Sequence, residues 1–460
     1  MFARDKMLKW SAVFAFGVML CMAFVFFKER ICFADAAGTT INLIGTKCFS
    51  IQLDRYGAFI TQVLPLIAIY CHASLKTICQ LYSVNFVLFH AAVFAIIYYW
   101  KQYQLALIWL CYFVLMMSDS FFYVHNEIYT AHAYVLLGFA LYQKDSDYQS
   151  GFSFKGYIPL GLFCLGLFCH LSVICTIVFG LVFLFVLEGK KIKGYGFIFW
   201  LLLLCMCILM KFIFLQSNWY DSEKLESFGR WHLLMELFTL KSTVMFLHAL
   251  YTTHLFFSVF TIFVLAFLIR FKQWIHVALM LGACVLYFVL TSILFSNAAL
   301  MFYMQSEWLT YSIFITFPFA YLVLPRLDKL AYLIPVIVLQ CVVHIYLVYP
   351  NYSRALRWKK KQLTYMKENQ LAKMLILPST IEKDAVISTW AMGYESILLS
   401  SLKGKGHTRT FYSSPYIVDA DTNSQSFNRI AIGGNTFADT ILDKSYFNLP
   451  KAVYIIKKDE

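Results

Sequence analysis

Long apolar segments separated by short polar ones run along most of this chain. The first of them, 10–27, contains eighteen residues without a charged side chain. Because a helix needs about 20 apolar residues to cross a bilayer, windows of that length predict about eleven transmembrane helices. We expect them at 10–27, 83–100, 104–119, 127–143, 158–170, 172–188, 197–214, 252–271, 275–295, 309–326 and 329–349. The segments 158–170 and 172–188 form either a tight hairpin or one long tilted helix.

The composition agrees with this pattern and excludes a soluble protein. Of the 460 residues, 61% are hydrophobic and 14% are charged, and the mean hydropathy is +0.68. Such a chain is an α-helical polytopic membrane protein, and many of its Tyr and Trp residues are expected at the membrane interfaces. The net charge of +13 is scattered between the spans. It therefore favours contact with anionic lipid and gives no reason to expect a nucleic-acid partner.

Lys and Arg in the short loops set the expected orientation, because basic loops stay on the cytoplasmic side. They fall on one side of the predicted helices, at Arg4, Lys6, Lys9, Lys101, Lys144, Lys155, Lys190, Lys191, Lys193, Arg270, Lys272, Arg326 and Lys329. The N-terminus is therefore expected in the cytoplasm, and the loops 28–82 and 215–251 and the tail after Pro350 on the opposite side.

One basic cluster resists this orientation. It follows the last predicted span closely and consists of Arg354, Arg357, Lys359, Lys360 and Lys361. The positive-inside rule would prefer these residues in the cytoplasm. Either the cluster has a function on the outer face, or the span count is wrong by one.

The first outward loop contains more than a connection. Its apolar segment 59–69 is too short to cross the membrane and is interrupted by Pro65, so it lies in the interface or dips in and out. A second segment of this kind is 241–251. Cys32 and Cys48 also fall in the first loop, where they either form a disulfide or remain free thiols.

The tail changes character, which indicates a second domain. A charged helical stretch, 354–373, is followed by short apolar runs that are typical of strands, at 385–388, 429–432 and 452–456. About 110 residues are enough for a small domain. We therefore expect a transmembrane domain over 1–350 and a C-terminal extracytoplasmic α/β domain over 351–460.

Three short stretches of the first loop carry a resemblance to a known family. They are Phe33-Ala34-Asp35-Ala36-Ala37, Asp54-Arg55-Tyr56 and Gln62-Val63-Leu64-Pro65. Together with the arrangement of spans, outward loop and tail, they resemble the GT-C superfamily of integral membrane glycosyltransferases, and GT-C-like proteins of Bacteroidota in particular. Many GT-C enzymes carry two adjacent acids after the first span, whereas Asp35 has Ala on both sides. A two-acid or metal-assisted version is therefore in doubt.

The resemblance implies transfer of a sugar from a polyprenyl-phosphate carrier to a glycan, lipid or protein acceptor at the outer face of a bacterial inner membrane. A carboxylate can remove the proton of an acceptor hydroxyl, and Asp35 is the candidate base. A cation should face the leaving phosphate, and Arg55 is the candidate. The plainer interpretations are that Asp35 is a solvated acid or a helix cap, and that Arg55 pairs with Asp54 or with lipid headgroups.

Other polar residues are secondary candidates for binding the substrate. They are Asp54, Gln62, His125, Glu127 and Glu307. Glu127 begins a predicted helix, and Glu307 stands at the start of another, so each is equally well explained as a favourable acid in a first turn. Asp119 lies close to His125 and Glu127 in the sequence and is grouped with them.

The sequence gives little reason to expect a metal or another cofactor. Residues His232 and Glu236 share a helical spacing near His248 and His254, but no His-Glu-x-x-His pattern occurs. The histidines inside or beside spans are interpreted as packing residues: His170, His276 and His344. The donor would be a polyprenyl-phosphate sugar, with no cofactor besides it.

Functions of other classes remain open at this point. A polysaccharide polymerase or ligase would also act on polyprenyl-linked glycans, although its large outward loop would be expected late in the chain. A transporter should carry charges near the middle of its spans, and these spans are nearly bare of charge there. A non-catalytic assembly protein of the envelope is the third alternative. The sugar, the acceptor and the oligomeric state are not predicted.

Overall fold

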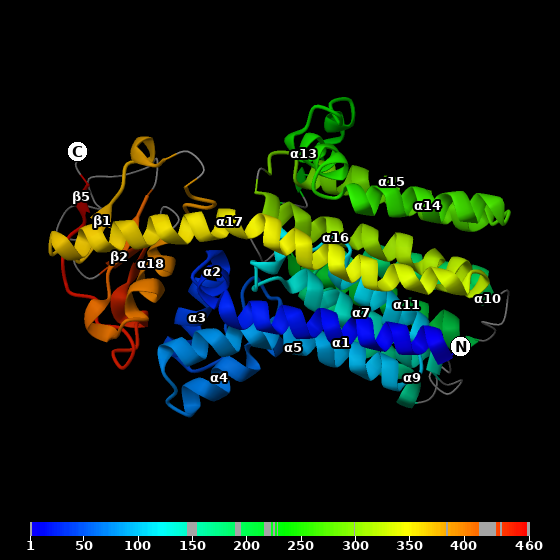
Figure 1. Ribbon diagram of the computed structural model, residues 1–460, viewed down its shortest axis with the longest axis horizontal. Helices are drawn as coiled ribbons and strands as arrows, with labels where there is room; N and C mark the ends of the chain where they lie inside the picture. The colour runs from blue at the N-terminus through cyan, green and yellow to red at the C-terminus, as the bar shows by residue number, and fades with distance from the viewer. Residues whose placement is uncertain are drawn as a thin grey trace.

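The computed structural model describes residues 2–144, 154–188, 195–215, 222–223, 226–227, 229–298, 300–382, 385–413, 429–432 and 435–457. This part of the chain is mostly helical, and its long helices lie side by side along the long axis of the molecule (Figure 1). The N-terminus lies at one end of the bundle, and the C-terminal strands lie at the other.

Long apolar helices identify a helical membrane protein. Within the described residues, five helical stretches are long and apolar enough to cross a bilayer, at 5–25, 75–99, 274–294, 301–326 and 329–368. They contain the helices α1 (Phe2–Val25), α5 (Leu75–Tyr99), α15 (Trp274–Leu294), α16 (Met301–Pro318) and α17 (Leu333–Glu368). A sixth span results if α13 (Lys241–Tyr251) and α14 (Leu255–Arg270), which are bent by 79° at their junction, count together.

The remaining predicted spans coincide with helices whose described residues are too short or not apolar enough to cross a bilayer by this criterion of length and hydropathy. These are α6 (Tyr103–Val114), α7 (Glu127–Lys144), α9 (Phe154–Cys169), α10 (Val173–Glu188) and α11 (Tyr195–Leu215). The expected count of about eleven spans therefore stays a prediction. The pair of segments 158–170 and 172–188 forms two helices, because α9 ends at Cys169 and α10 begins at Val173. A single long helix is therefore excluded.

The loop 28–82 folds into short helices at the end of the bundle opposite the N-terminus (Figure 1). They are α2 (Phe27–Ile31), α3 (Ala34–Thr46), the 3₁₀ helix η1 (Tyr56–Gln62) and α4 (Val63–Tyr70). Pro65 falls in the first turn of α4, where its missing N–H has no partner to lose, so the proline does not interrupt this helix. The 11-residue helix α13 is the second short segment, and it turns sharply into α14.

Buried Arg30 fixes the connection between α1 and the first loop. Its Nε donates to the carbonyl oxygen of Phe121 at 2.9 Å, and its Nη1 donates to the carbonyl and hydroxyl oxygens of Ser83 at 2.7 and 2.8 Å. The Ser83 hydroxyl in turn donates to the carbonyl oxygen of Ala23 at 2.6 Å. These bonds hold α2 against α5 and against the short helix η2 (Asp119–Phe121).

The last long helix, α17, is continuous through Pro350, so it joins the predicted span 329–349 to most of the predicted helical stretch 354–373. Its 36 residues extend over about 54 Å at 1.5 Å per residue, which exceeds the roughly 30 Å of a bilayer core. The basic cluster 354–361 lies on this extension. Figure 1 shows α17 running from the bundle to the C-terminal strands.

The C-terminal part contains a small parallel sheet with one helix against it. Strand β1 (Lys373–Leu375) lies between β2 (Thr410–Tyr412) and β5 (Ile455–Ile456), with Met374 opposite Phe411 and Ile455. Helix α18 (Met392–Ser401) packs on β2 and also contacts α3. A separate antiparallel pair is formed by β3 (Arg429–Ile432) and β4 (Asn435–Ala438).

The expected strands in this part have mixed outcomes. The strand at 429–432 is confirmed, and 452–456 is strand only at its last two residues. The run 385–388 is not a strand, because Ala385 packs with Trp358 and Met374 in a small apolar cluster instead of joining a sheet. The remaining short helices are η3 (Trp231–Leu234), η4 (Phe319–Val323), η5 (Leu324–Arg326), η6 (Asp328–Tyr332), η7 (Pro378–Thr380), η8 (Lys405–His407) and η11 (Asp439–Ile441).

Candidate functional site

Two adjoining hollows lie where the first loop meets the helix bundle. The larger, which we call the polar cavity, has a volume of about 880 Å³, and its lining includes Asp35, Arg55, Tyr123, His125 and Glu127. The smaller, which we call the apolar pocket, has a volume of about 240 Å³. The two share four lining residues: Arg55, Leu294, Phe295 and Tyr303.

Asp35 lies in the first turn of α3, half-buried in the wall of the polar cavity. The Tyr123 hydroxyl donates to its Oδ2 at 2.6 Å. Burial raises the pKa of the Asp35 carboxyl above its usual value, although His125 and the Tyr123 hydroxyl oppose that rise. Asp35 is therefore not an acid in bulk solvent. Its carboxyl group is fixed by the hydrogen bond from Tyr123 and lines the polar cavity.

The start of α3 is held by a residue from the far end of the chain. Glu395 on α18 accepts a hydrogen bond from the Ala34 backbone N–H at 2.7 Å, across 361 residues of sequence. Its other oxygen lies 2.7 Å from the Lys359 ammonium group, which also donates to the Cys32 carbonyl oxygen at 3.1 Å. This buried ion pair sets the position of the helical turn that carries Asp35.

Arg55 is buried and makes its ion pair with Glu127, since its Nη1 lies 2.9 Å from Glu127 Oε2. The other carboxylate oxygen of Glu127 lies 3.2 Å from His125 Nε2. Burial lowers the pKa of His125, but the negative charge of Glu127 and of Asp35 outweighs burial and leaves this pKa above its usual value. Asp35, His125, Glu127 and Arg55 thus form one charged group around the polar cavity.

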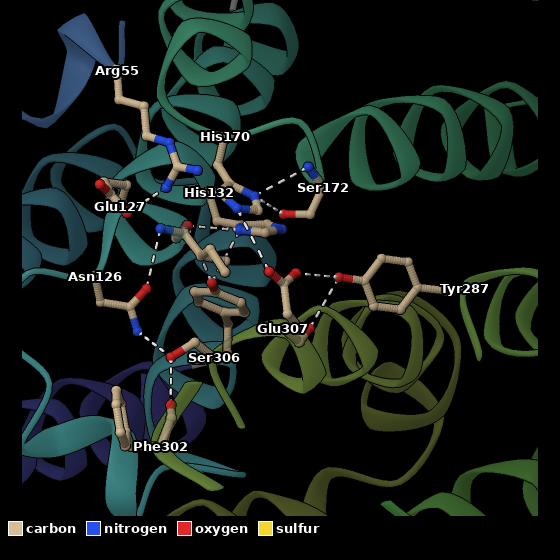
Figure 2. Close-up of polar contacts among 12 residues, drawn as sticks. Arg55, Asn126, Glu127, His132, His170, Ser172, Tyr287, Phe302, Ser306 and Glu307 are labelled. Carbon is tan, nitrogen blue, oxygen red and sulfur yellow. Dashed lines mark hydrogen bonds and ion pairs between the residues drawn. The ribbon is translucent and has the colours of Figure 1, made fainter. Parts of the chain in front are cut away.

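Glu307 belongs to the apolar pocket, where its side chain lies between His170 and Tyr287 (Figure 2). Its Oε1 lies 3.6 Å from His170 Nε2, and the Tyr287 hydroxyl donates to its backbone carbonyl at 3.0 Å. Asn126, beside the start of α7, donates to the Ser306 hydroxyl at 2.7 Å and so links α7 to α16. Glu307 is 2% exposed, so it is an interior group and not a surface cap.

Two predicted site residues point elsewhere. Among the described residues, neither Asp54 nor Gln62 is part of the lining of the two hollows. Asp54 stands in a turn with φ 56°, where it accepts a hydrogen bond from the Tyr56 hydroxyl at 3.3 Å. Gln62 is fully buried and makes two hydrogen bonds to the backbone of Ser50, so it pins the loop and has no free side chain for a substrate.

Asp119 is also separate from the charged group. The Tyr352 hydroxyl on α17 donates to its Oδ1 at 3.1 Å, and the Ser118 hydroxyl donates to its other oxygen at 3.3 Å. Asp119 therefore links the turn 118–121 to α17.

Cys32 is buried beside α17 and Cys48 is exposed, and both are free thiols.

Several residues of the two hollows were missed by the sequence reasoning. Tyr123 carried no signal of its own, and His170 was interpreted as a packing residue although it faces Glu307. Buried Lys211 on α11 lines the apolar pocket, with its ammonium group 5.4 Å from the ring centre of Phe168. A charge inside an apolar helix was the one available signal for Lys211.

The polar cavity also has walls from outside the helix bundle. The segment before α13 contributes Arg230, and the C-terminal part contributes Trp390, Tyr394 and Phe437. In the described part of the chain, no group of three or more His, Cys, Asp or Glu side chains is arranged to hold a metal ion. This result includes His232, Glu236, His248 and His254.

The fold and the two hollows define a class: a helical membrane protein with a charged cavity beside an apolar pocket at one end of its helix bundle. Comparisons of the chain with protein-family models, with curated proteins and with solved structures found no match.

Proposed function

We propose that the protein is a membrane glycosyltransferase of the GT-C type, which moves a sugar from a polyprenyl-phosphate carrier to an acceptor at the outer face of a bacterial inner membrane. The observation that carries the proposal is the sharing of Arg55 between two unlike hollows. The polar one also holds Asp35, and the apolar one is suited to a lipid chain. A lipid-linked sugar phosphate has the same sequence of parts: an apolar chain, an anion and a polar sugar.

In this mechanism Asp35 acts as the general base. The acceptor hydroxyl loses its proton to the Asp35 carboxylate while its oxygen attacks the anomeric carbon of the sugar. The bond between that carbon and the phosphate oxygen breaks, and the electron pair stays on the phosphate. One displacement of this kind inverts the configuration at the anomeric carbon. The raised pKa makes Asp35 a stronger base than an ordinary carboxylate.

The cation for the leaving phosphate is Arg55. Charge develops on the phosphate as the sugar departs, and a fixed guanidinium stabilises that charge without having to reorganise. Glu127 serves to hold Arg55 in one direction through the 2.9 Å ion pair. Lys211, which lines the apolar pocket, is a second cation on the side where the lipid chain would enter.

The acceptor would occupy the part of the polar cavity nearest the C-terminal residues. Trp390, Tyr394 and Phe437 give this side an aromatic wall, which is the usual composition of a small-molecule site. The proposal includes a bundle of about eleven spans with a cytoplasmic N-terminus. It also includes a periplasmic α/β domain over 351–460 whose residues complete the acceptor side.

The experiment is a donor screen with the purified protein in liposomes. A panel of polyprenyl-phosphate hexoses and pentoses, labelled in the sugar, is added with envelope extract as the acceptor source, and release of free polyprenyl phosphate is measured. We expect one donor to be consumed in proportion to protein. If a protein that unfolds cooperatively on heating consumes none of them, the proposal fails. Consumption of diphosphate-linked oligosaccharides instead would indicate a polymerase or ligase.

A further inference from the structure

A cationic groove of about 520 Å³ lies between the first loop, α17 and the C-terminal part, away from the polar cavity. Six basic side chains line it: Lys28, Lys76, Lys360, Lys367, Lys403 and Arg409. Among the described residues of the lining there is no Asp or Glu. Four separate stretches of the chain therefore bring like charges together, an arrangement that costs free energy unless an anion is bound.

The six cations are poorly compensated by protein groups. Within the described part of the chain, none of them forms an ion pair with a carboxylate. The Nε of Arg409 is buried and has no hydrogen-bond partner there. Burial raises the pKa of Glu29, and the charges of Lys360 and Lys28 oppose that rise, so Glu29 offsets the charge of two of the six cations in part. A bound anion would supply the missing partner.

The position of the groove indicates the kind of anion. Lys28 comes three residues after the end of α1, and Lys76 is the second residue of α5, so both stand at the end of a membrane-spanning helix. Phe27, Leu363 and Leu399 add apolar surface beside the charges. A lipid headgroup at the bilayer surface presents its phosphate at this level with acyl chains next to it.

We propose that the cationic groove binds the phosphate of an anionic membrane lipid. This assignment gives a function to Lys360, one of the five basic residues after the last predicted span that the positive-inside rule would place in the cytoplasm. It is independent of the glycosyltransferase proposal, because the groove shares no lining residue with the polar cavity among those described. Neighbouring Lys360 and Lys361 offer a matched pair: Lys360 lines the groove, whereas Lys361 lies 3.8 Å from Glu382 and is exposed.

The test measures how strongly the full-length protein, purified in detergent, retains phosphatidylglycerol and phosphatidylcholine, with native mass spectrometry as the readout. We expect preferential retention of phosphatidylglycerol that weakens with salt. Each cation removed should weaken this retention about fivefold, as for a basic residue near an anionic surface. Thus Lys360→Gln and Arg409→Gln should lower retention, and their combination should lower it further, while Lys361→Gln should leave it unchanged.

Three outcomes would overturn the proposal. One is equal retention of the two lipids by the unchanged protein. Another is equal loss in Lys360→Gln and Lys361→Gln, which would mean that only general surface charge matters. The third is displacement of the lipid by millimolar pyrophosphate together with tight pyrophosphate binding in the absence of lipid. That result would identify the groove as a site for a soluble phosphate compound.

Discussion

Asp35→Asn is the substitution that separates chemistry from folding most sharply. Asparagine has nearly the same shape and still accepts the Tyr123 hydrogen bond, but it cannot take a proton from an acceptor hydroxyl. General-base catalysis contributes about 10²–10⁴-fold to a rate. We therefore expect sugar transfer to fall at least about 100-fold, which corresponds to about 2.7 kcal/mol of barrier.

The same substitution should not weaken the fold. A carboxyl whose pKa is raised on folding binds its proton more tightly in the folded state than in the unfolded state. Stability then falls as the pH rises from the ordinary pKa of Asp, about 3.9, through the raised value, and the cost remains at neutral pH. Because Asn carries no charge, Asp35→Asn should unfold at the same temperature as the unchanged protein or at a higher one near pH 7.

The measurement pairs the release of polyprenyl phosphate with the thermal unfolding midpoint in the same preparation. Asp54→Asn is the matched control, since Asp54 is an acid of the same loop outside the cavity lining, and Asn accepts its positive φ readily. This control should keep full transfer. The assignment of Asp35 as base is refuted if Asp35→Asn retains full transfer at normal abundance, or if both variants lose transfer equally.

Three further predictions concern the charged groups around the polar cavity and the ion pair that positions the start of α3. Glu127→Gln removes the charged partner of buried Arg55 and should lower the free energy of unfolding by about 3–5 kcal/mol. The double variant with Arg55→Gln should recover part of this loss, because the unpaired charge is then gone. If thermal unfolding shows that the losses of the two single variants simply add in the double variant, the pairing is contradicted. Glu395→Gln removes the negative charge opposite buried Lys359 and loosens the start of α3, so both the unfolding temperature and kcat should fall. An unchanged kcat would show that the Glu395–Lys359 ion pair does not position Asp35. Because the pKa of His125 is raised in the folded protein, protonation of His125 adds stability that is present below about pH 6.5 and is lost as the pH rises through the raised value. His125→Gln should therefore reduce the fall of the unfolding temperature with pH in this range, measured in a series of thermal unfolding curves. An unchanged pH dependence would assign it to other groups.

The sequence predicted those parts of the fold that follow from the local pattern of apolar and polar residues. Uninterrupted apolar runs identified a membrane protein and the approximate positions of α1, α14, α15 and α16. The continuation of α17 was missed because a proline followed by charged residues normally ends a helix. Pro350 is tolerated inside α17, and the charged turns after it are stabilised by packing against distant elements such as α18. That packing is not visible in a local window.

Part of the candidate site could be predicted because its residues come from the same stretch of the sequence. Asp35 and Arg55 come from one loop, and the structure brings both to the polar cavity. Asp54 and Gln62 lie in the same loop but face away, because the direction of a side chain depends on backbone conformation, such as the positive φ at Asp54. The contact between His170 and Glu307 could not be predicted, because the two residues are far apart in the sequence.

The dependence of Asp35 on the far end of the chain changes how the first loop should be understood. The sequence places Asp35 in the loop after the first span and gives no sign of a partner from elsewhere in the chain. Instead, the N–H of Ala34, one residue before Asp35, is bonded to Glu395, and Glu395 is held by Lys359 from the extension of α17. A hydrogen bond to a charged carboxylate is stronger than a neutral one, and this one is buried, so its loss would leave a charge without a partner. The turn that carries Asp35 is thus built jointly by the first loop and the C-terminal part, and so is the cavity, because Trp390 and Tyr394 also line it. In the proposed enzyme, the C-terminal part would then help to build the catalytic site and would not serve only as a cover.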